Sequence, residues 1–185
     1  AAGQGDIILC RAGENRATGQ TRDQAKQALA AIGHPYYEQP YGVSIPSFYA
    51  MVTRLHMHEY ETTRNQLAKV AVISRDFEVR HPNAHMKTRI SVNDVINSKP
   101  IAEPLNILDC CLISDAGGAY IVTSAERAKD LKSHPIYIYG IGEYHTHEHL
   151  MCAESLTEVR AVQSGKRAYS MAGLGPADID FAELY

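Results

Sequence analysis

The sequence has no tryptophan, few cysteines and no long apolar run. Four cysteines occur in 185 residues, none in a CxxC arrangement, so neither a disulfide framework nor a zinc knuckle is expected. No stretch approaches the roughly 20 apolar residues that a membrane span requires. We therefore expect a cytoplasmic protein with reduced thiols and no membrane partner.

Basic residues are also in short supply. Lys and Arg number 18 against 21 for Asp and Glu, which gives a formal net charge of -3 and a pI near 6.3. Nucleic acids and anionic membranes select basic surfaces, so this composition argues against both as partners. Hydrophobic residues make up 45% of the chain, which is a globular composition. A small molecule or another protein is the expected partner.

Helical and strand patterns alternate along the chain and predict an α/β fold. Residues 5–19 read as a strand and turn, and 135–142 and 179–184 read as further strands. Capping boxes predict helix starts. They are Thr63 with Gln66, Ser91 with Asp94, Thr123 with Glu126, and Ser155 with Glu158, the last opening a helix through Val159 to Gly173. This order indicates βαβ units and a mainly parallel sheet, with the helical stretch 46–100 as an insertion.

Three histidines alternate in EYHTHEHL, residues 143–150. On a strand, a period of two would put His145, His147 and His149 on one face, as in HxH metal sites. The acidic residue of the usual hydrolase signature is missing at its offset. Three interpretations stay open: a site for substrate or proton transfer, a metal site, and solvated loop histidines.

Adjacent Cys110 and Cys111 offer a thiolate, which is a nucleophile suited to thioesters. Both lie in an apolar run, where a buried thiol acts as a small hydrophobe, and this packing interpretation is favoured. His56 and His58 lie two residues apart on a helix, share no face, and are expected to be structural.

Five blocks of sequence stand in the order found in the thiolase superfamily. They are YGVSIPSFYAMVTRLHMHEYETTRNQLAKVAVISR, HPNAHM, IAEPLNILDCCLISDAGGAYIVTSAERA, GIGEYHTHEHL and SGKRAYSMAGLGPADIDFAELY. The chain resembles this superfamily from residue 3 to 185, and most resembles its lipid-transfer-protein branch, which includes steroid side-chain aldolases. The resemblance implies a layered α-β-α fold, here partial, with a helical loop domain inserted.

The resemblance also implies a domain organisation. Residues 1–19 would end the N-terminal thiolase half, 20–105 would form the loop domain, 106–134 would complete that half, and 135–185 would begin the C-terminal half. The expected chain is therefore the central part of a longer subunit. The blocks with the nucleophilic Cys and the HGG-type His are absent, so we expect the fragment alone to be inactive.

Site residues follow from the same resemblance. The DCCLISD segment occupies the place where thiolases line the pantetheine arm of coenzyme A, so the candidate CoA contacts are Cys111 and Ser114. The acyl group would meet tyrosines that act as acid or base, with imidazoles as proton relay. These candidates are Tyr185, Tyr144, His145 and His147. No metal and no separate cofactor is implied, because coenzyme A is part of the substrate.

Three functions remain open from the sequence. The favoured one is retro-aldol cleavage of a β-hydroxyacyl-CoA that carries a steroid or other bulky side chain, by a homodimer with a small OB-fold partner. The alternatives are a Cys-dependent acetyl-CoA acetyltransferase and a non-catalytic lipid or acyl-CoA binder. The chain carries Tyr185 where biosynthetic thiolases place Asn-Glu-Ala-Phe, which favours the aldolase.

The sequence departs from the family pattern at two places. Glu61 stands where members carry Gly, and because Glu avoids positive φ, a different turn is expected between the flanking helices. SDAGGAY shifts a glycine by one place, and Gly117 and Gly118 are expected to allow tight packing of a helix on a strand.

Overall fold

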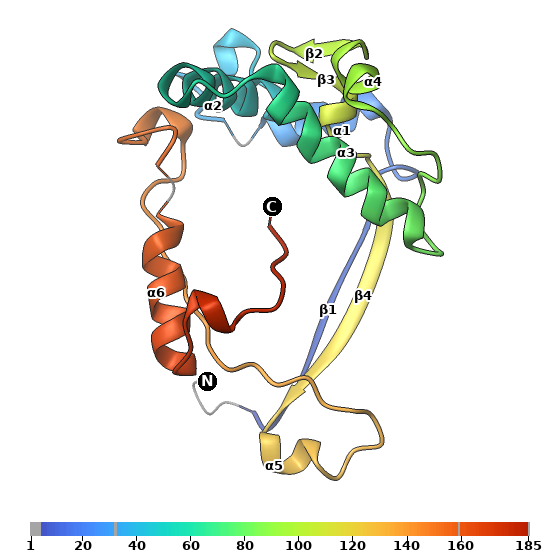
Figure 1. Ribbon diagram of the computed structural model, residues 1–185, viewed down its shortest axis with the longest axis vertical. Helices are drawn as coiled ribbons and strands as arrows, with labels where there is room; N and C mark the ends of the chain where they lie inside the picture. Colours follow the sequence, from blue (N-terminus) through green and yellow to red (C-terminus); the bar gives the residue numbers. More distant parts are fainter. Residues whose placement is uncertain (1–4, 32, 159, 185) are drawn as a thin grey trace. The chain divides into compact units, whose positions relative to one another are not determined.

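The computed structural model describes residues 5–31, 33–158 and 160–184 (Figure 1). Its α-helices are α1 (Arg22–Ala30), α2 (Ile45–Tyr60), α3 (Arg64–Arg80), α4 (Val92–Ile96), α5 (Ala125–Ala128) and α6 (Ala161–Ala172). Its strands are β1 (Ile7–Asn15), β2 (Pro100–Ala102), β3 (Leu105–Asn106) and β4 (Asp115–Thr123). Short 3-10 helices are η1 (Gln39–Tyr41), η2 (Ile107–Asp109), η3 (Leu150–Cys152) and η4 (Pro176–Asp178). The predicted mixed α/β class is confirmed.

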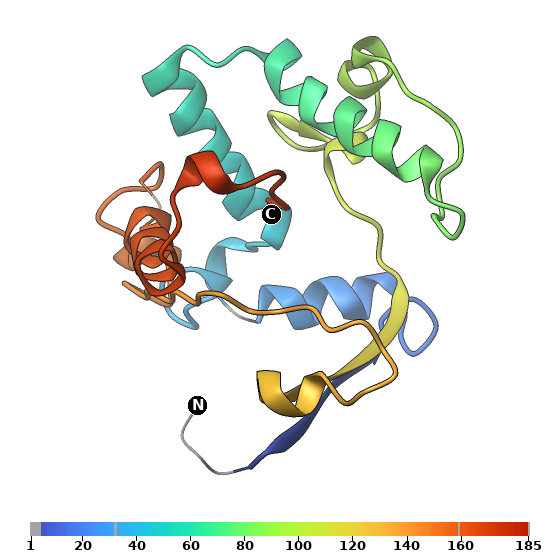
Figure 2. The same cartoon turned by 60° about the horizontal axis from the view of Figure 1, so that its bottom comes forward.

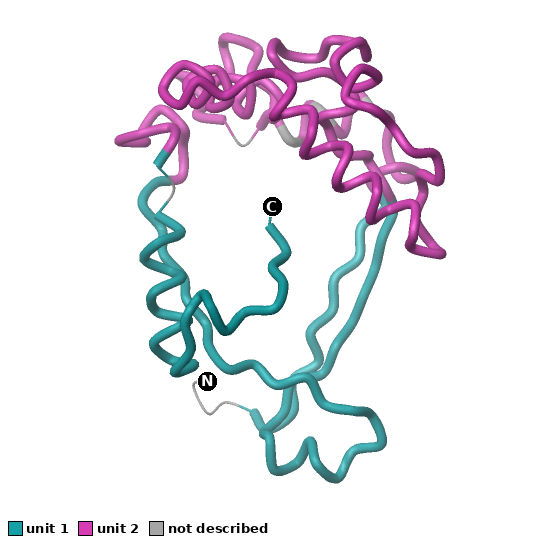
Figure 3. The backbone as a smooth tube through the Cα atoms, in the orientation of Figure 1, with its two compact units in different colours: residues 1–15, 115–147, 158–185 teal, residues 16–114, 148–157 magenta. Residues whose placement is uncertain are grey.

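The chain divides into two compact units, which Figure 3 colours separately. Unit 1 comprises residues 1–15, 115–147 and 158–185, and contains β1, β4, α5 and α6. Unit 2 comprises residues 16–114 and 148–157, and contains α1 to α4 with β2 and β3. None of the helices in the described parts of the chain is long and apolar enough to cross a membrane.

Helices α2, α3 and α4 of unit 2 begin at capping boxes. Two of these were predicted: Thr63 with Gln66 opens α3, and Ser91 with Asp94 opens α4. In each box the N-cap hydroxyl accepts a hydrogen bond from the N3 backbone, and the N3 side chain accepts one from the N-cap backbone. Both helix starts are therefore confirmed. A capping box favours a helix start because it satisfies two N–H groups that the helix itself leaves unpaired.

Small and branched side chains form the buried core of unit 2. They are Ala25, Ala50, Ala68, Val95 and Leu105. Three of these are alanines, one each on α1, α2 and α3, and α1 contacts α2. Helix α3 contacts both α4 and η2, so the segment that follows β3 is held against the helices.

Glu61 ends α2 in the left-handed conformation, with φ 55° and ψ 25°. The expectation that glutamate would avoid positive φ here is wrong. The conformation costs a non-glycine residue about 1–2 kcal/mol. It also turns the chain so that Thr63 can cap α3 two residues later, and that capping box offsets the cost.

Strands β1 and β4 run side by side in Figures 1 and 2 and pair antiparallel, from Ile7 opposite Thr123 to Asn15 opposite Asp115. The prediction of a mainly parallel sheet is wrong for the described residues, where both strand pairs are antiparallel. The reason is topological. Residues 16–114 form most of a separate unit, so β1 and β4 meet as its entering and leaving strands and not through a crossover helix.

The adjacent glycines of β4 face a strand. Gly117 lies opposite Gly13 and Gly118 opposite Ala12 in the ladder. A Cβ atom at Gly117 would lie 3.5 Å from the carbonyl oxygen of Ala12. The predicted packing of a helix on these two residues is therefore wrong in the part of the chain that is described.

Several predicted elements in unit 1 begin or end elsewhere. The segments 135–142 and 179–184 are irregular and not strands, because no described strand hydrogen-bonds to them. Helix α5 is capped by Ser124, whose hydroxyl accepts from the Arg127 backbone at 3.3 Å, and not by Thr123.

Helix α6 begins later than predicted. Its N-cap is Arg160, without a side-chain capping bond, so the box of Ser155 with Glu158 does not open it, and Val159 lies outside the described residues. Its end is confirmed, because Gly173 adopts φ 67° and Leu174 donates to the carbonyl of Tyr169 at 3.2 Å.

Candidate functional site

The structure distributes the predicted site residues over both units. Cys111 and Ser114 belong to unit 2, and Tyr144, His145 and His147 belong to unit 1. The remaining candidate, Tyr185, lies outside the described residues.

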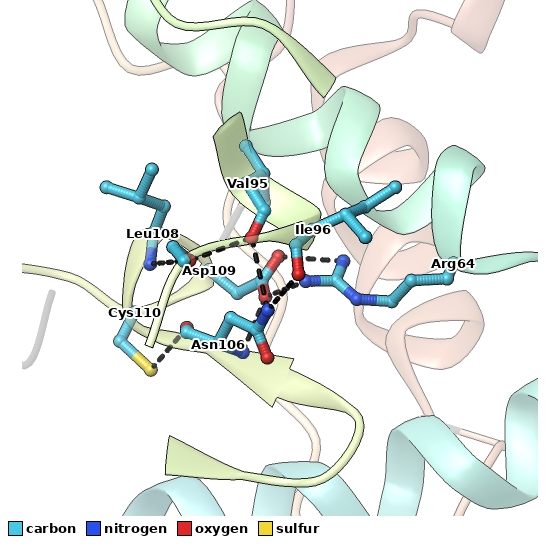
Figure 4. Close-up of polar contacts among 8 residues, drawn as sticks. Arg64, Val95, Ile96, Asn106, Leu108, Asp109 and Cys110 are labelled. Atoms are coloured by element: carbon cyan, nitrogen blue, oxygen red, sulfur yellow. Dashed lines mark hydrogen bonds and ion pairs between the residues drawn. The ribbon is translucent and has the colours of Figure 1, made fainter. Parts of the chain in front are cut away.

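A buried ion pair anchors the segment that leads to Cys111. Arg64, at the start of α3, donates from Nη1 to Asp109 Oδ1 at 3.2 Å and from Nη2 to Oδ2 at 2.5 Å (Figure 4). The Asp109 side chain is only 4% exposed and that of Arg64 21%. Asp109 Oδ2 also accepts a hydrogen bond from the backbone N–H of Asn106 at 2.7 Å. A two-pronged pair of this kind fixes both distance and orientation.

Asn106 joins the same segment to the end of α4. Its Nδ2 donates to the carbonyl of Val95 at 3.2 Å and to that of Ile96 at 2.6 Å (Figure 4). These carbonyls belong to the last residues of α4, and that of Val95 also accepts from the backbone N–H of Ser98 at 3.2 Å. Residues 106–109 are therefore tied to α3 through Arg64 and to α4 through Asn106.

The two adjacent cysteines differ in environment. The Cys110 Sγ donates to the carbonyl of Asn106 at 3.5 Å, whereas Cys111 is exposed. Burial raises the pKa of the Cys110 thiol, and the charges of Asp109 and Cys111 raise it further. The packing interpretation thus describes Cys110. Cys111 is exposed and is therefore accessible to a ligand.

Tyr144 lies under a guanidinium group from α6. The Cζ atom of Arg167 is 5.4 Å from the centroid of the Tyr144 ring, and its Nη1 donates to the carbonyl of Glu143 at 2.7 Å. Tyr144 is 42% exposed, so the residue is not enclosed by the packing of α6. A cation over an aromatic face is attracted by the ring quadrupole, which stabilises this placement.

Imidazoles flank the tyrosine in the same segment. His145 Nε2 lies 2.7 Å from Glu143 Oε1, and both side chains are largely exposed. His147 Nδ1 lies 2.7 Å from the hydroxyl of Thr146. When a carboxylate binds one nitrogen of an imidazole, the other nitrogen stays available to exchange protons.

The third histidine of the alternation belongs to unit 2. His149 Nδ1 lies 3.8 Å from Oε2 of buried Glu38. Hydrogen bonds from the backbone of His34, first, and of Met151 hold the pKa of the Glu38 carboxyl below its usual value. Within the described ranges, no group of three or more His, Cys, Asp and Glu side chains is arranged as metal ligands.

Two functional neighbours escaped sequence reasoning. Arg64 and Asp109 are 45 residues apart, and no local pattern links them. Arg167 stands in an ordinary polar stretch of α6, and its contact with Tyr144 depends on how that helix packs. The one local signal was the pair Gly140 and Gly142, whose missing side chains indicate a close approach of backbone.

Comparison with known proteins identifies the relatives of this chain. Residues 142–185 match the family model described as Thiolase C-terminal domain-like. An acetyl-CoA acetyltransferase of Methanothermobacter thermautotrophicus is 35% identical over the whole chain, which spans 48% of that protein. The chain is thiolase-like.

Two further relatives are aldolases by name. A steroid side-chain-cleaving aldolase of Thermomonospora curvata is 33% identical over the whole chain, which spans 50% of that protein. A solved structure described as an Ltp2-ChsH2(DUF35) aldolase superposes with a TM-score of 0.78 at 33% identity, covering 94% of this chain and 46% of the other. The thiolase-like chain spans about half the length of the curated relatives it matches.

Proposed function

We propose that the thiolase-like chain is part of an enzyme that cleaves a β-hydroxyacyl-CoA by a retro-aldol reaction, with a steroid or other bulky group on the acyl chain. The observation that carries this is the arrangement of Tyr144, an accessible phenol beneath the guanidinium of Arg167. The likeness to a steroid side-chain-cleaving aldolase over the full chain supports it.

The reaction needs one base and one acid. A base removes the proton of the β-hydroxyl group, the bond between Cα and Cβ breaks, and a carbonyl product leaves. The electron pair of that bond stays on the CoA thioester as an enolate, which takes up a proton at Cα from the acid. Tyr144 and Tyr185 are the proposed acid and base, and a phenol in either role contributes about 10²- to 10⁴-fold.

The histidines complete the proton path in this proposal. His145, held by Glu143 at 2.7 Å, exchanges protons between Tyr144 and solvent, with His147 as the second candidate relay. Both imidazoles are bonded to neighbours on their own segment, so they are oriented before substrate binds.

Coenzyme A is the proposed handle of the substrate. Cys111 and Ser114 line its pantetheine arm, and the helical loop domain covers the nucleotide end. The network of Arg64 and Asp109 supports this assignment, because it gives the segment before Cys111 a rigid attachment to two helices. No separate cofactor is required.

We also propose that the enzyme is a homodimer that works with a small OB-fold protein. A related solved structure is described as an Ltp2-ChsH2(DUF35) aldolase, a name that pairs two components. The assembly would place a second protein beside a substrate too bulky for one subunit to enclose.

A second candidate is acetyl-CoA acetyltransferase activity. The 35% identity to the Methanothermobacter thermautotrophicus enzyme favours it. That activity requires a nucleophilic cysteine, and Cys110 is unsuited because burial raises its thiol pKa. The resemblance to thiolases places that cysteine in a sequence block that does not occur among these 185 residues.

Product analysis of the complete subunit separates the candidates. Incubation with a steroid β-hydroxyacyl-CoA is expected to give a steroid carbonyl compound and a shortened acyl-CoA in equal amounts, without consumption of free CoA. Acetoacetyl-CoA with free CoA should give no acetyl-CoA. Thiolysis without cleavage of the hydroxyacyl substrate would establish the acetyltransferase instead, and binding without turnover of either would leave a lipid or acyl-CoA binder.

A further inference from the structure

Helix α6 closely contacts the segment before Tyr144 at Gly140, Gly142 and Glu143. A Cβ atom at Gly140 would run into the carbonyl of Ala168, and one at Gly142 into the carbonyl of Ser164. Arg167, on the same helix, then binds the Glu143 carbonyl at 2.7 Å. The backbone before Tyr144 therefore rests directly on α6, which side chains at the two glycines would prevent.

These contacts with α6 determine where the Tyr144 ring lies. With the backbone fixed at Gly142 and Glu143, the ring falls beneath the guanidinium, at 5.4 Å from Cζ. Arginine keeps its charge at every pH at which the protein is folded. A neighbouring positive charge favours the anionic form of a phenol over its neutral form. One side chain thus both orients the ring and supplies charge to it.

We propose that Arg167 is the positioning residue for Tyr144, holding the ring for proton transfer and stabilising the phenolate that forms when the proton leaves. The inference rests on the proposed function, in which Tyr144 is an acid or base. It adds a residue with a defined task to that site. The ionisable neighbours in this arrangement are Arg167 from α6 and Glu143 with His145 from the segment itself.

Two substitutions separate orientation from charge. Arg167→Gln keeps a donor for the Glu143 carbonyl and loses the charge, and Arg167→Lys keeps the charge and loses the planar group. In the complete subunit we expect Arg167→Gln to lower kcat on the order of tenfold, within the hundredfold cost of misplacing a catalytic group. KM should change less than about twofold, and Arg167→Lys should lie between the two proteins.

The split between kcat and KM is the readout that a merely structural role would not move. A residue that only stabilises the fold changes the fraction of folded protein, whereas loss of a positioning residue lowers the kcat of the folded enzyme with KM nearly unchanged. Arg167→Lys should recover part of the kcat that Arg167→Gln loses. Lys166→Gln removes the neighbouring exposed charge of α6 and is the matched control, with kinetics expected to equal those of the parent protein.

Tyr144→Phe, assayed beside these variants, distinguishes failure of the inference from failure of the proposed function. Loss of activity in Tyr144→Phe with a parental kcat in Arg167→Gln would overturn the role of Arg167 alone. A parental rate in Tyr144→Phe would remove Tyr144 from the reaction and the inference with it. A lowered melting temperature with a parental kcat in the folded protein would make Arg167 structural. If Arg167→Gln does not fold, the kcat of Arg167→Lys compared with that of Lys166→Gln carries the test.

Discussion

The two arginines that matter in this chain work in opposite surroundings. Arg64 lies in unit 2 against a carboxylate that is 4% exposed and that also accepts from the backbone N–H of Asn106. Arg167 lies in unit 1 on an exposed face, over a tyrosine that is 42% exposed. Burial strengthens the electrostatic interactions of a charged group and also keeps reactants away from it. The first arginine therefore fixes a backbone segment, and the second can take part in a reaction.

The largest effect on stability is expected from a substitution at Asp109. Asp109→Asn leaves the Arg64 charge without its partner in a site where its own side chain is only 21% exposed. We expect a loss of about 3–5 kcal/mol in the free energy of unfolding, the usual cost of removing one member of a buried pair. Melting temperature and amide hydrogen exchange at Asn106 measure it.

The exposed pair of Asp76 with Arg89 is the matched control for that experiment. Their atoms lie 2.9 Å apart, with side chains 38% and 64% exposed. Asp76→Asn should cost at most about 1 kcal/mol. Equal effects of the two substitutions would contradict the structural weight given to Arg64 and Asp109.

In unit 1, a substitution at Gly142 tests the close contact between α6 and the segment before Tyr144. Gly142→Ala forces a methyl group against the Ser164 carbonyl and should destabilise by about 1–3 kcal/mol, as overpacking does. Activity of the complete subunit should fall as well, because Tyr144 moves away from Arg167. Gly118→Ala, where nothing lies within 4 Å of the added Cβ, should leave both unchanged. A neutral Gly142→Ala would show that the close contact is absent in solution.

Thiol reactivity sharpens the contrast between buried and exposed chemistry. Because the pKa of Cys110 is raised, the unreactive thiol form persists to higher pH than in an ordinary cysteine. Alkylation with iodoacetamide at neutral pH, followed by mass spectrometry, should modify exposed Cys111 several times faster than Cys110. Asp109→Asn removes one of the charges that raise this pKa, so Cys110 should become reactive at lower pH. Equal rates at both cysteines would contradict the burial of Cys110.

The smallest effect is expected at Glu61. Glu61→Gly relieves a left-handed conformation at φ 55° and should stabilise the turn between α2 and α3 by less than about 1 kcal/mol, because glycine also gains entropy in the unfolded chain. A rise of a few degrees in melting temperature would be the largest change consistent with this. Destabilisation would mean that the Glu61 side chain has a role that its conformation does not show.

Local signals predicted local structure well. The boxes at Thr63 and Ser91 lie within one helical turn, and the structure confirms both. The left-handed end of α6 at Gly173 was equally local. Pairing over long distances was not predictable in this way. Residue Ile7 faces Thr123 in the ladder, and a pattern of alternating elements could not reveal that their strands run antiparallel.

The candidate site came from family resemblance more than from physical pattern. The spacing of His145 and His147 alone left metal, proton transfer and solvation open, and their assignment as relays remains a prediction. Arg167 became visible only when α6 was placed against the glycines of the preceding segment, since packing across 24 residues brings it to Glu143. Asp109 and Arg64 both stood inside recognised blocks, but no local pattern paired them.

Steady-state kinetics of Tyr144→Phe, Tyr185→Phe and the double variant in the complete subunit test the central claim most directly. Removing each hydroxyl leaves a ring to fill its place, so kcat should fall about 10²- to 10⁴-fold with little change in KM or melting temperature. If the two phenols act in one proton path, the double variant should be far from additive. A parental rate with a lowered melting temperature in both single variants would show that these hydroxyls only hold structure, and would contradict a tyrosine-based retro-aldol reaction.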